Sequence, residues 1–136
     1  MNRKGFQQLA AVRLREAKLL LAANAPDGAY YLAGYAVEFA LKACIAKFRQ
    51  RHDFPDKVRV NRSHTHNLKD LIGVAGLKDA HVEAMRQYEF SRRWDIVIQW
   101  NEESRYRDNS ADDASALIEA IENRSYGLLQ WLKKHY

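Results

Sequence analysis

The sequence predicts an all-α protein, an antiparallel up-and-down bundle of four to five helices. Proline occurs only at Pro26 and Pro55 and glycine is sparse, so few residues interrupt regular structure. Apolar residues recur at helical spacing over long segments. No repeat or linker-like stretch divides the 136 residues, so residues 1–136 are expected to form a single domain.

The N-terminal third of the chain predicts two long helices. The first presents an apolar face on which Arg13 is the only polar residue. Residues 24–28, Asn-Ala-Pro-Asp-Gly, should end it, and Asp27 is expected to cap the next helix. The second helix should run from about Gly28 to Arg49. Because it is apolar on most sides and rich in alanine, we expect it to be central and the most buried.

The middle of the chain predicts shorter elements. Residues 52–66 are polar and contain a proline, which indicates a loop. Asn67 is a candidate cap for a short helix that ends near Gly73. A further helical region should begin near Asp79. The pattern does not fix its end, because residues 94–100 contain β-branched residues that could bend or unwind the helix. This region is expected to carry Val82, Met85, Tyr88 and Trp94.

The last helix has the clearest start. Residues 110–113, Ser-Ala-Asp-Asp, form a capping-box pattern, in which a hydroxyl and an acid three residues later satisfy the first free N–H groups. Apolar residues then recur at helical spacing from Ala114 to Leu132. We therefore expect one continuous helix over this segment.

Charge and composition narrow the function classes. The net charge is +5, with a local +5 over residues 42–62 and a local −5 over residues 102–123. The basic stretch suits an anion such as RNA phosphate, or it complements the C-terminal dipole of the second helix. The lone Cys44 fits a reducing compartment, and no signal or membrane-spanning pattern is present. We expect a cytoplasmic protein without membrane contact.

Three groups of polar residues are candidates for a site. Glu38 lies inside the apolar run of residues 33–48, where a buried carboxylate must be paired, hydrogen-bonded or protonated. It is either a structural hub or the polar floor of a ligand site. Tyr31, Tyr35 and Lys42 lie on or near its face, and His66 or Asn67 could reach it from the loop. Arg105 and Tyr106 either hold a nucleotide, by stacking and phosphate contact, or form a salt-bridged turn.

The histidines and the absent motifs bear on catalysis. His64 and His66 have Asp70 as the only nearby acid, so we expect loop donors rather than a zinc site, and no metal or cofactor. The chain has no glycine-rich phosphate loop, no G-x-S-x-G and no H-E-x-x-H. Cys44 lies in the expected buried helix, where it is poorly placed for a nucleophile.

Several motifs occur in an order that resembles the HEPN family of helical domains. Residues 29–45, "AYYLAGYAVEFALKACI", resemble the second helix of that family, with Glu38 followed by "ALKA". Residues 65–71, "THNLKDL", are similar to its H-x-L-x-x-L helix start. Trp100, Arg105 and Tyr106 resemble a segment that precedes the last helix in many bacterial members. The resemblance spans roughly residues 6–132 and implies a bacterial helical bundle that forms a homodimer.

The resemblance also implies where a ribonuclease site would lie. Many members carry on a late helix an Arg and a His that are separated by four to six intervening residues, and the pair cleaves RNA without a metal. No such pair is present in the late helices of this chain. The spacing occurs once, between Arg59 and His64 with His66 in range, and we interpret it as coincidence. Arg59, His64 and His66 are therefore the only candidates for catalysis.

Three functions remain open from the sequence. The first is a non-catalytic dimeric module that binds a nucleotide, an RNA or a partner protein, such as the small nucleotidyltransferase of a toxin–antitoxin pair. The second is a metal-independent ribonuclease that cleaves single-stranded RNA, and the third is a purely structural oligomer. For the first, the expected ligand-binding residues are Tyr31, Glu38, Lys42, His66, Arg105 and Tyr106.

Overall fold

The structure, a computed structural model, describes residues 1–50 and 65–136. Over these residues every regular element is a helix, with seven α-helices and one short 3₁₀-helix. The predicted all-α class is therefore confirmed. The helices outnumber the four to five expected because two segments that were each expected to be one helix are divided. Most of the loop expected over residues 52–66 lies outside the described residues.

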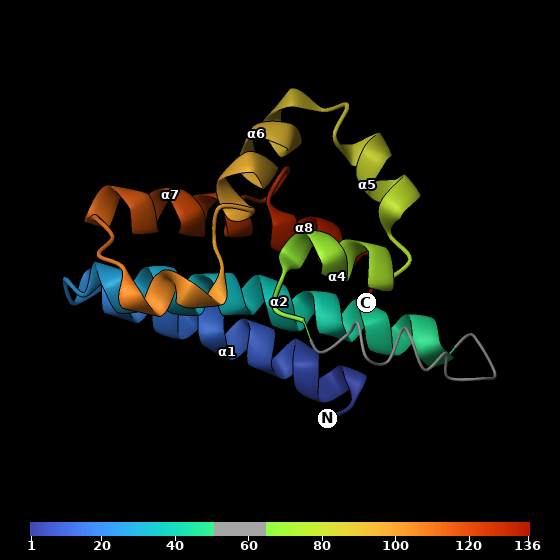
Figure 1. Cartoon of the computed structure of the whole chain (residues 1–136), viewed down its shortest axis with the longest axis horizontal. Helices are drawn as coiled ribbons and strands as arrows, with labels where there is room; N and C mark the ends of the chain where they lie inside the picture. The colour runs from blue at the N-terminus through green and yellow to red at the C-terminus, as the bar shows by residue number, and fades with distance from the viewer. Residues whose placement is uncertain (51–64) are drawn as a thin grey trace.

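The two N-terminal helices form an antiparallel hairpin (Figure 1). Helix α1 (Arg3–Ala22) begins at Asn2, whose side chain accepts a hydrogen bond from the N–H of Gly5. A turn with Asn24 in the left-handed region leads into α2 (Pro26–Gln50). Asp27 does not cap α2 as expected, because the helix already begins at Pro26. The Asp27 carboxylate instead accepts a hydrogen bond from the N–H of Asn109, far along the chain.

Helix α2 is the centre of the molecule, as its composition predicts. It packs against α1 and four later elements, and small side chains such as Ala33 and Ala40 are fully buried along it. Cys44 is buried there too, and burial raises the pKa of its thiol to about 12. A thiol held protonated in this way is not a nucleophile at neutral pH.

The segment after the undescribed residues is divided more finely than its periodicity predicts. Asn67 caps α4 (Leu68–Val74) as expected. The helical region that was expected to start near Asp79 is two helices, α5 (Lys78–Ala84) and α6 (Tyr88–Val97). Val82 and Tyr88 are exposed rather than part of the core. The chain turns at residues 85–87 because α6 packs against α7 and α8, whereas α5 buries none of its own side chains.

Helix α6 is fixed to the next long helix by a buried cation. Arg93 is 5% exposed, and its guanidinium donates hydrogen bonds of 2.7 Å to Glu89 of α6 and of 2.7 Å to Glu119 of α7 (Ala111–Glu122). The same guanidinium holds the pKa of both carboxyls below the ordinary value. A buried Arg with two carboxylate partners holds α6 across α7, and its pairing is not apparent from the sequence.

The C-terminal segment opens as predicted but does not continue as one helix. The 3₁₀-helix η1 (Glu102–Tyr106) precedes α7, and Ser110 and Asp113 form the expected capping box. The chain breaks after Glu122, where the Asn123 side chain accepts hydrogen bonds from the N–H groups of Ser125 and Tyr126. Helix α8 (Leu128–Lys133) follows as a separate element. The prediction of a single helix from Ala114 to Leu132 is therefore wrong.

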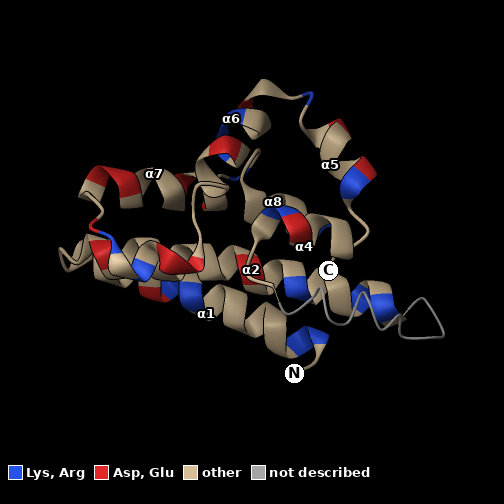
Figure 2. Ribbon diagram, viewed as in Figure 1, with Lys and Arg blue, Asp and Glu red and all other residues tan. Residues whose placement is uncertain are grey.

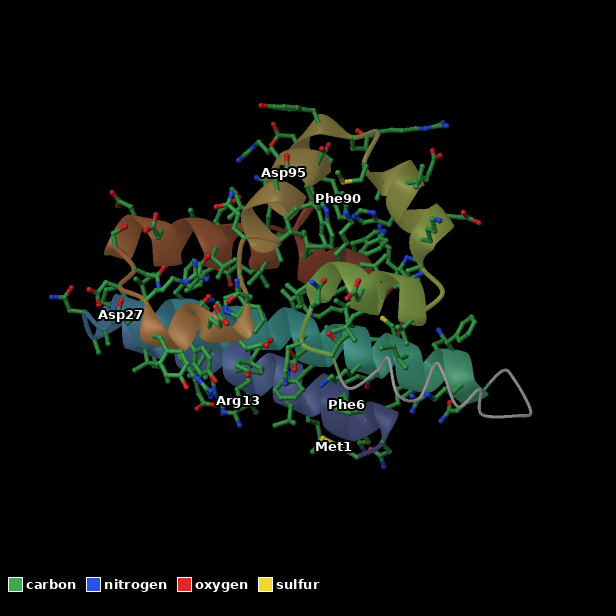
Figure 3. All side chains as sticks on the ribbon, viewed as in Figure 1. Met1, Phe6, Arg13, Asp27, Phe90 and Asp95 are labelled. Atoms are coloured by element: carbon green, nitrogen blue, oxygen red, sulfur yellow. The ribbon has the colours of Figure 1, made fainter. Side chains whose placement is uncertain are left out.

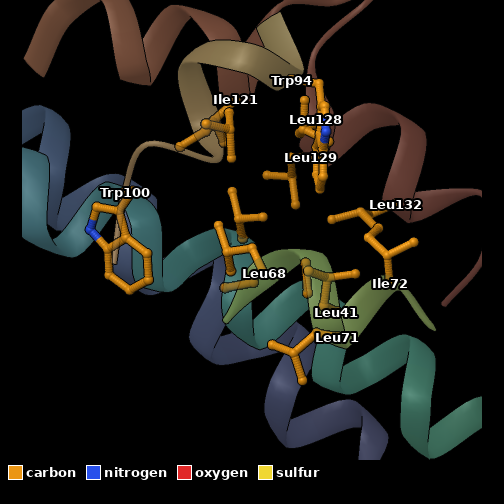
Figure 4. Packing of buried hydrophobic residues seen from close by; sticks show 14 of the residues in the cluster. Leu41, Leu68, Leu71, Ile72, Trp94, Trp100, Ile121, Leu128, Leu129 and Leu132 are labelled. Atoms are coloured by element: carbon orange, nitrogen blue, oxygen red, sulfur yellow. The ribbon is translucent and has the colours of Figure 1, made fainter. Parts of the chain in front are cut away.

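The hydrophobic core lies between α2 and the later helices (Figure 4). Leu41 of α2, Leu71 of α4, Ile121 of α7 and Leu132 of α8 are all fully buried. Trp100, at the end of the connection from α6, is 2% exposed and belongs to the same cluster. Among the described residues, no helix combines the length and the apolar character that crossing a membrane requires.

Charge is distributed unevenly over the helices (Figure 2). Acidic residues gather at the start of α7, and basic residues at the end of α2 and the start of α1. Lys47 and Arg49 lie in the last turn of α2, where cations complement the helix dipole. Lys42, one of the other basic residues of this stretch, lies earlier on α2, and residues 51–62 lie outside the described residues.

Candidate functional site

Glu38 is the buried charge at the middle of α2 and the starting point of the site. Its side chain is 1% exposed, and both carboxylate oxygens have a partner. Oε2 accepts a hydrogen bond of 3.2 Å from Lys42 Nζ, one turn later on the same helix. Oε1 lies 2.8 Å from His66 Nδ1. The expected contacts of Glu38 with Lys42 and His66 are thus confirmed, and the carboxylate joins α2 to the residue that leads into α4.

His66 is held in place by the backbone around it. The Thr65 hydroxyl accepts a hydrogen bond from the N–H of Asn67, and the Asn67 side chain caps α4. Asn67 is thus used as a cap, and it is His66 that reaches Glu38. The His66 side chain is 42% exposed. Because Nδ1 donates to a carboxylate, the tautomer is set and Nε2 is the ring nitrogen that remains for another partner.

Two tyrosines extend this cluster along α2 toward its N-terminus. The Tyr35 ring meets the His66 ring edge-on with centroids 6.2 Å apart, and the Tyr31 ring in the same way at 5.0 Å. The Tyr31 hydroxyl donates to the Tyr35 hydroxyl over 3.3 Å. Burial, and next the hydrogen bond from Tyr31, raise the pKa of Tyr35, which therefore stays protonated. The tyrosines supply flat, neutral surfaces beside the Glu38 pair.

Trp100 brings a distant part of the chain onto the same surface. Its indole N–H donates a hydrogen bond of 3.2 Å to the carbonyl oxygen of Tyr31, and its ring packs edge-on against Tyr35 at 5.1 Å. The indole lies directly on Gly34, where a Cβ would come within 2.1 Å of the ring. The missing side chain of Gly34 therefore creates the space that positions η1 next to α2.

Helix η1 then places a cation and an aromatic ring at the surface. The Arg105 guanidinium lies 4.7 Å from the centre of the Tyr106 ring, and Tyr106 is 75% exposed. Interaction with the Tyr31 hydroxyl raises the pKa of Arg105. Arg107 has another role, since it donates to the side chains of Asn101 and Ser104 and so stabilises the turn.

The alternative of a salt-bridged turn is not what the structure contains. Within residues 1–50 and 65–136, no carboxylate forms an ion pair with Arg105 or Arg107. The guanidinium of Arg105 is exposed and rests on Tyr106 instead. It is therefore available to an external anion.

The residues expected to bind a ligand lie together along one face of α2, and we call this set the Glu38 strip. It links Lys42 and His66 at one end to Arg105 and Tyr106 at the other, through the rings and hydroxyls of two tyrosines. The residues expected to bind a ligand did not include the connecting residues Tyr35 and Trp100. Tyr35 was expected near Glu38, three residues before it on the helix, whereas no sequence signal indicated the contact of Trp100 with α2. The members of the Glu38 strip are Tyr31, Glu38, Lys42, His66, Arg105 and Tyr106.

The Glu38 strip permits two kinds of chemistry. Cations beside exposed aromatic rings can hold a phosphate and stack a base. A histidine oriented by a buried carboxylate can also transfer protons. The other two candidates for catalysis, Arg59 and His64, lie outside the described residues. Only His66 of that group is placed.

No protein-family model, curated protein or solved structure matches this chain. The contacts that join α2, the residues before α4 and η1 are therefore the structural basis for a proposed function.

Proposed function

We propose that the chain is a non-catalytic, HEPN-like module that binds a nucleotide unit, free or within single-stranded RNA, along the Glu38 strip. The observation that carries the proposal is the exposed Arg105–Tyr106 pair, which lies next to Tyr31 and has no carboxylate partner among the described residues. An unpaired guanidinium on an exposed ring is suited to a phosphate and a base at once.

The other members of the Glu38 strip complement this pair. Lys42 and His66 lie at the opposite end and offer donors to a second phosphate or to a ribose. The Glu38 carboxylate itself accepts from both of them and is 1% exposed, so its role is to orient the donors. Arg105 and Tyr106 are exposed, which suits an extended strand lying on an open surface.

The wider architecture belongs to the same proposal. The α1–α2 hairpin with the elements packed on α2 would be the antiparallel four- to five-helix bundle that the HEPN resemblance implies, with additional short helices. The module would act as a homodimer in the bacterial cytoplasm. A nucleotidyltransferase of a toxin–antitoxin pair is the partner protein that the resemblance favours.

Two exposed tyrosines make a direct test possible. Tyr106 and Tyr88 are 75% and 74% exposed, but only Tyr106 belongs to the Glu38 strip. Binding of a fluorescently labelled 12-nucleotide RNA would be followed by anisotropy at low salt. We expect Tyr106→Ala to weaken binding by roughly fivefold to 150-fold, because one stacked base is worth about 1–3 kcal/mol. Tyr88→Ala should bind as the wild type does.

The result that would overturn the proposal is equally specific. If Tyr106→Ala and Tyr88→Ala lose RNA affinity to the same extent, the RNA does not lie on the Glu38 strip. Absence of binding by the wild type to the RNA, and to AMP and ATP in a thermal-shift titration, would remove the proposal altogether. Light scattering would test the dimer separately.

One observation favours a second function, cleavage of single-stranded RNA. His66 Nδ1 lies 2.8 Å from a buried carboxylate, and its side chain is 42% exposed. This is the arrangement in which an imidazole can act as a general acid or base. RNA would be incubated with the wild type and with His66→Ala in the presence of EDTA. Cleavage by the wild type that His66→Ala lacks would replace the non-catalytic proposal, and intact RNA in both would eliminate this one.

A further inference from the structure

A second recess lies away from the Glu38 strip, between α5, α6 and α8. It has a volume of about 560 Å³, within the range of small-molecule sites. It shares no residue with the Glu38 strip. Phe90 lies on the side of α6 that faces α5, where its ring meets His81 (Figure 3). We call this recess the α5–α8 groove.

One wall of the α5–α8 groove is aromatic. Phe90 and Trp131 line it, with ring centres 5.3 Å apart and planes inclined by 62°. Tyr126, which is 37% exposed, stands at the rim. Trp131 is only half-buried, although it packs on the core. Phe90 is only 4% exposed, so Trp131 and Tyr126 supply the accessible ring surface, which favours a flat, apolar ligand.

The lining of the α5–α8 groove is also cationic. Arg124 and Lys134 line it together with a single carboxylate, Glu83 of α5. Lys134 and His135 also line an adjoining recess of about 330 Å³ that contains Lys47. Three basic side chains from α2 and the end of α8 therefore converge where the two recesses meet.

The pKa of His135 reflects the basic side chains around it. Burial, and then the charges of Lys47 and Lys134, lower the pKa of His135. Among residues 1–50 and 65–136, no carboxylate forms an ion pair with Lys47, Arg124 or Lys134. The positive potential at this junction is thus not neutralised by the described part of the chain, and an anion would be attracted to it.

We propose that the α5–α8 groove binds a small planar aromatic anion, with its ring against Trp131 and Phe90 and its anionic group at Lys134 and His135. The shape of the aromatic wall selects the ring, and the unpaired cations select the charge. The anionic group is a carboxylate or a phosphate, since a lysine ammonium accepts either. This site is independent of the function proposed for the Glu38 strip.

Three naphthalene probes separate the contribution of the aromatic ring from that of the anionic group. 2-Naphthoate and 2-naphthyl phosphate carry the ring with one or the other anion, and 2-naphthol is their neutral counterpart at pH 7.5. Isothermal titration calorimetry of the full chain should show at least one anion binding roughly fivefold or more tightly than 2-naphthol, the effect of about 1 kcal/mol from one partly exposed charge contact. The tighter of the two anions identifies the natural anionic group.

Adjacent lysines provide a matched pair of variants. Lys134 lines the α5–α8 groove, whereas Lys133 lines a different recess between α1 and α8. Lys134→Gln should reduce the preference for the anionic probe to about twofold or less and leave 2-naphthol binding unchanged. Lys133→Gln should behave as the wild type. Both side chains are exposed, and urea unfolding would verify that both variants fold.

The outcomes that would overturn the proposal are distinct. Equal binding of 2-naphthol and the two anions would remove the anionic part of the ligand. If Lys133→Gln and Lys134→Gln reduce the affinity for the anionic probes equally, the probes are attracted by the net charge of the protein and not by this groove. Absence of heat for every probe at millimolar concentration would remove the site.

Discussion

Glu38 shows how one residue can be both a packing element and the organiser of a site. A buried carboxylate is costly unless its oxygens are satisfied, and Lys42 and His66 satisfy one oxygen each. The same two contacts position both donors at the surface. The hub interpretation and the ligand-floor interpretation are therefore compatible, since the hub holds the groups that would touch a ligand.

Removing the carboxylate should lower stability. We expect Glu38→Ala to reduce the free energy of unfolding by roughly 1–3 kcal/mol, because it leaves the partners of a buried group unsatisfied. Urea unfolding monitored by circular dichroism would measure the change. Glu83→Ala, at a 71%-exposed carboxylate in a surface pair with Arg86, is the control and should change it by less than about 1 kcal/mol. Unchanged stability with lost RNA binding would mean that Glu38 serves the ligand rather than the fold.

His81 is a half-buried polar residue of α5 whose environment also makes a prediction. Its ring lies among the rings of Phe90, Trp94 and Trp131, and its Nε2 has no hydrogen-bond partner among the described residues. Burial lowers the pKa of His81. The unfolded chain therefore binds this proton more readily than the folded chain, so stability is complete above pH of about 6.5 and falls as the pH decreases below it.

Replacing the His81 imidazole should weaken the pH dependence of the free energy of unfolding. We expect His81→Phe to be at least as stable as the wild type at pH 7.5, since an unpaired polar atom is exchanged for carbon. Between pH 7.5 and 5.0 it should lose less free energy of unfolding than the wild type does. Part of the dependence will remain, because the pKa of His135 is lowered as well. Parallel stability curves for the two proteins would show that His81 is not buried in its neutral form.

Among the helices, α2 depends most on small side chains. Gly34 allows the Trp100 indole to lie on the helix backbone, and this contact brings η1 to the Glu38 strip. Alanine normally stabilises a helix interior relative to glycine by about 1 kcal/mol. At Gly34 the added Cβ would meet the indole at 2.1 Å, so overpacking must dominate.

Two glycine variants separate these effects. We expect Gly34→Ala to reduce the free energy of unfolding by roughly 1–3 kcal/mol and to weaken RNA binding, because η1 can no longer dock. Gly73 lies in α4 with no atom within 4 Å of an added Cβ, so Gly73→Ala should stabilise by up to about 1 kcal/mol. Urea unfolding followed by tryptophan fluorescence would compare them. A stabilised Gly34→Ala would show that Trp100 does not pack on this residue.

The helix ends show what local sequence can and cannot predict. Asn67 and the capping box at Ser110 were predicted correctly, because a cap is formed by residues a few positions apart. The breaks at residues 85–87 and 123–127 were missed. The first depends on the packing of α6 against α7 and α8, and the second on the bonds made by the Asn123 side chain. Neither is visible in hydrophobic periodicity.

The same division applies to the site over the whole molecule. The pairing of Glu38 with Lys42 follows from their spacing of four residues on one helix. The approach of Trp100 to Tyr31 joins residues 69 positions apart, and only the tertiary packing produces it. The grouping of Arg105 and Tyr106 with the rest of the Glu38 strip therefore required the structure. The catalytic candidates Arg59 and His64 remain predictions.

Two parts of the chain carry cations for the proposed RNA ligand, the Glu38 strip and the basic stretch of residues 42–62, and the salt dependence of binding can distinguish them. The Glu38 strip contains two permanent cations, Lys42 and Arg105, whereas residues 42–62 carry seven Lys and Arg. Each phosphate neutralised on a single strand contributes about −0.7 to the slope of log K against log salt. Binding to the Glu38 strip should therefore give a slope of about −1.4, and Arg105→Gln should reduce it by about 0.7.

Anisotropy titrations of the labelled RNA between about 25 and 200 mM NaCl, roughly an eightfold range of salt concentration, would measure this slope. Arg86→Gln is the control, since Arg86 is an exposed residue of the α5–α6 connection that pairs with Glu83 away from the Glu38 strip. A slope of about −4 or steeper that is unchanged in Arg105→Gln would assign the RNA to the basic stretch instead. A shallow slope that also falls in Arg86→Gln would indicate attraction by net charge alone. Only a shallow slope that decreases in Arg105→Gln and not in Arg86→Gln assigns the RNA phosphates to the Glu38 strip.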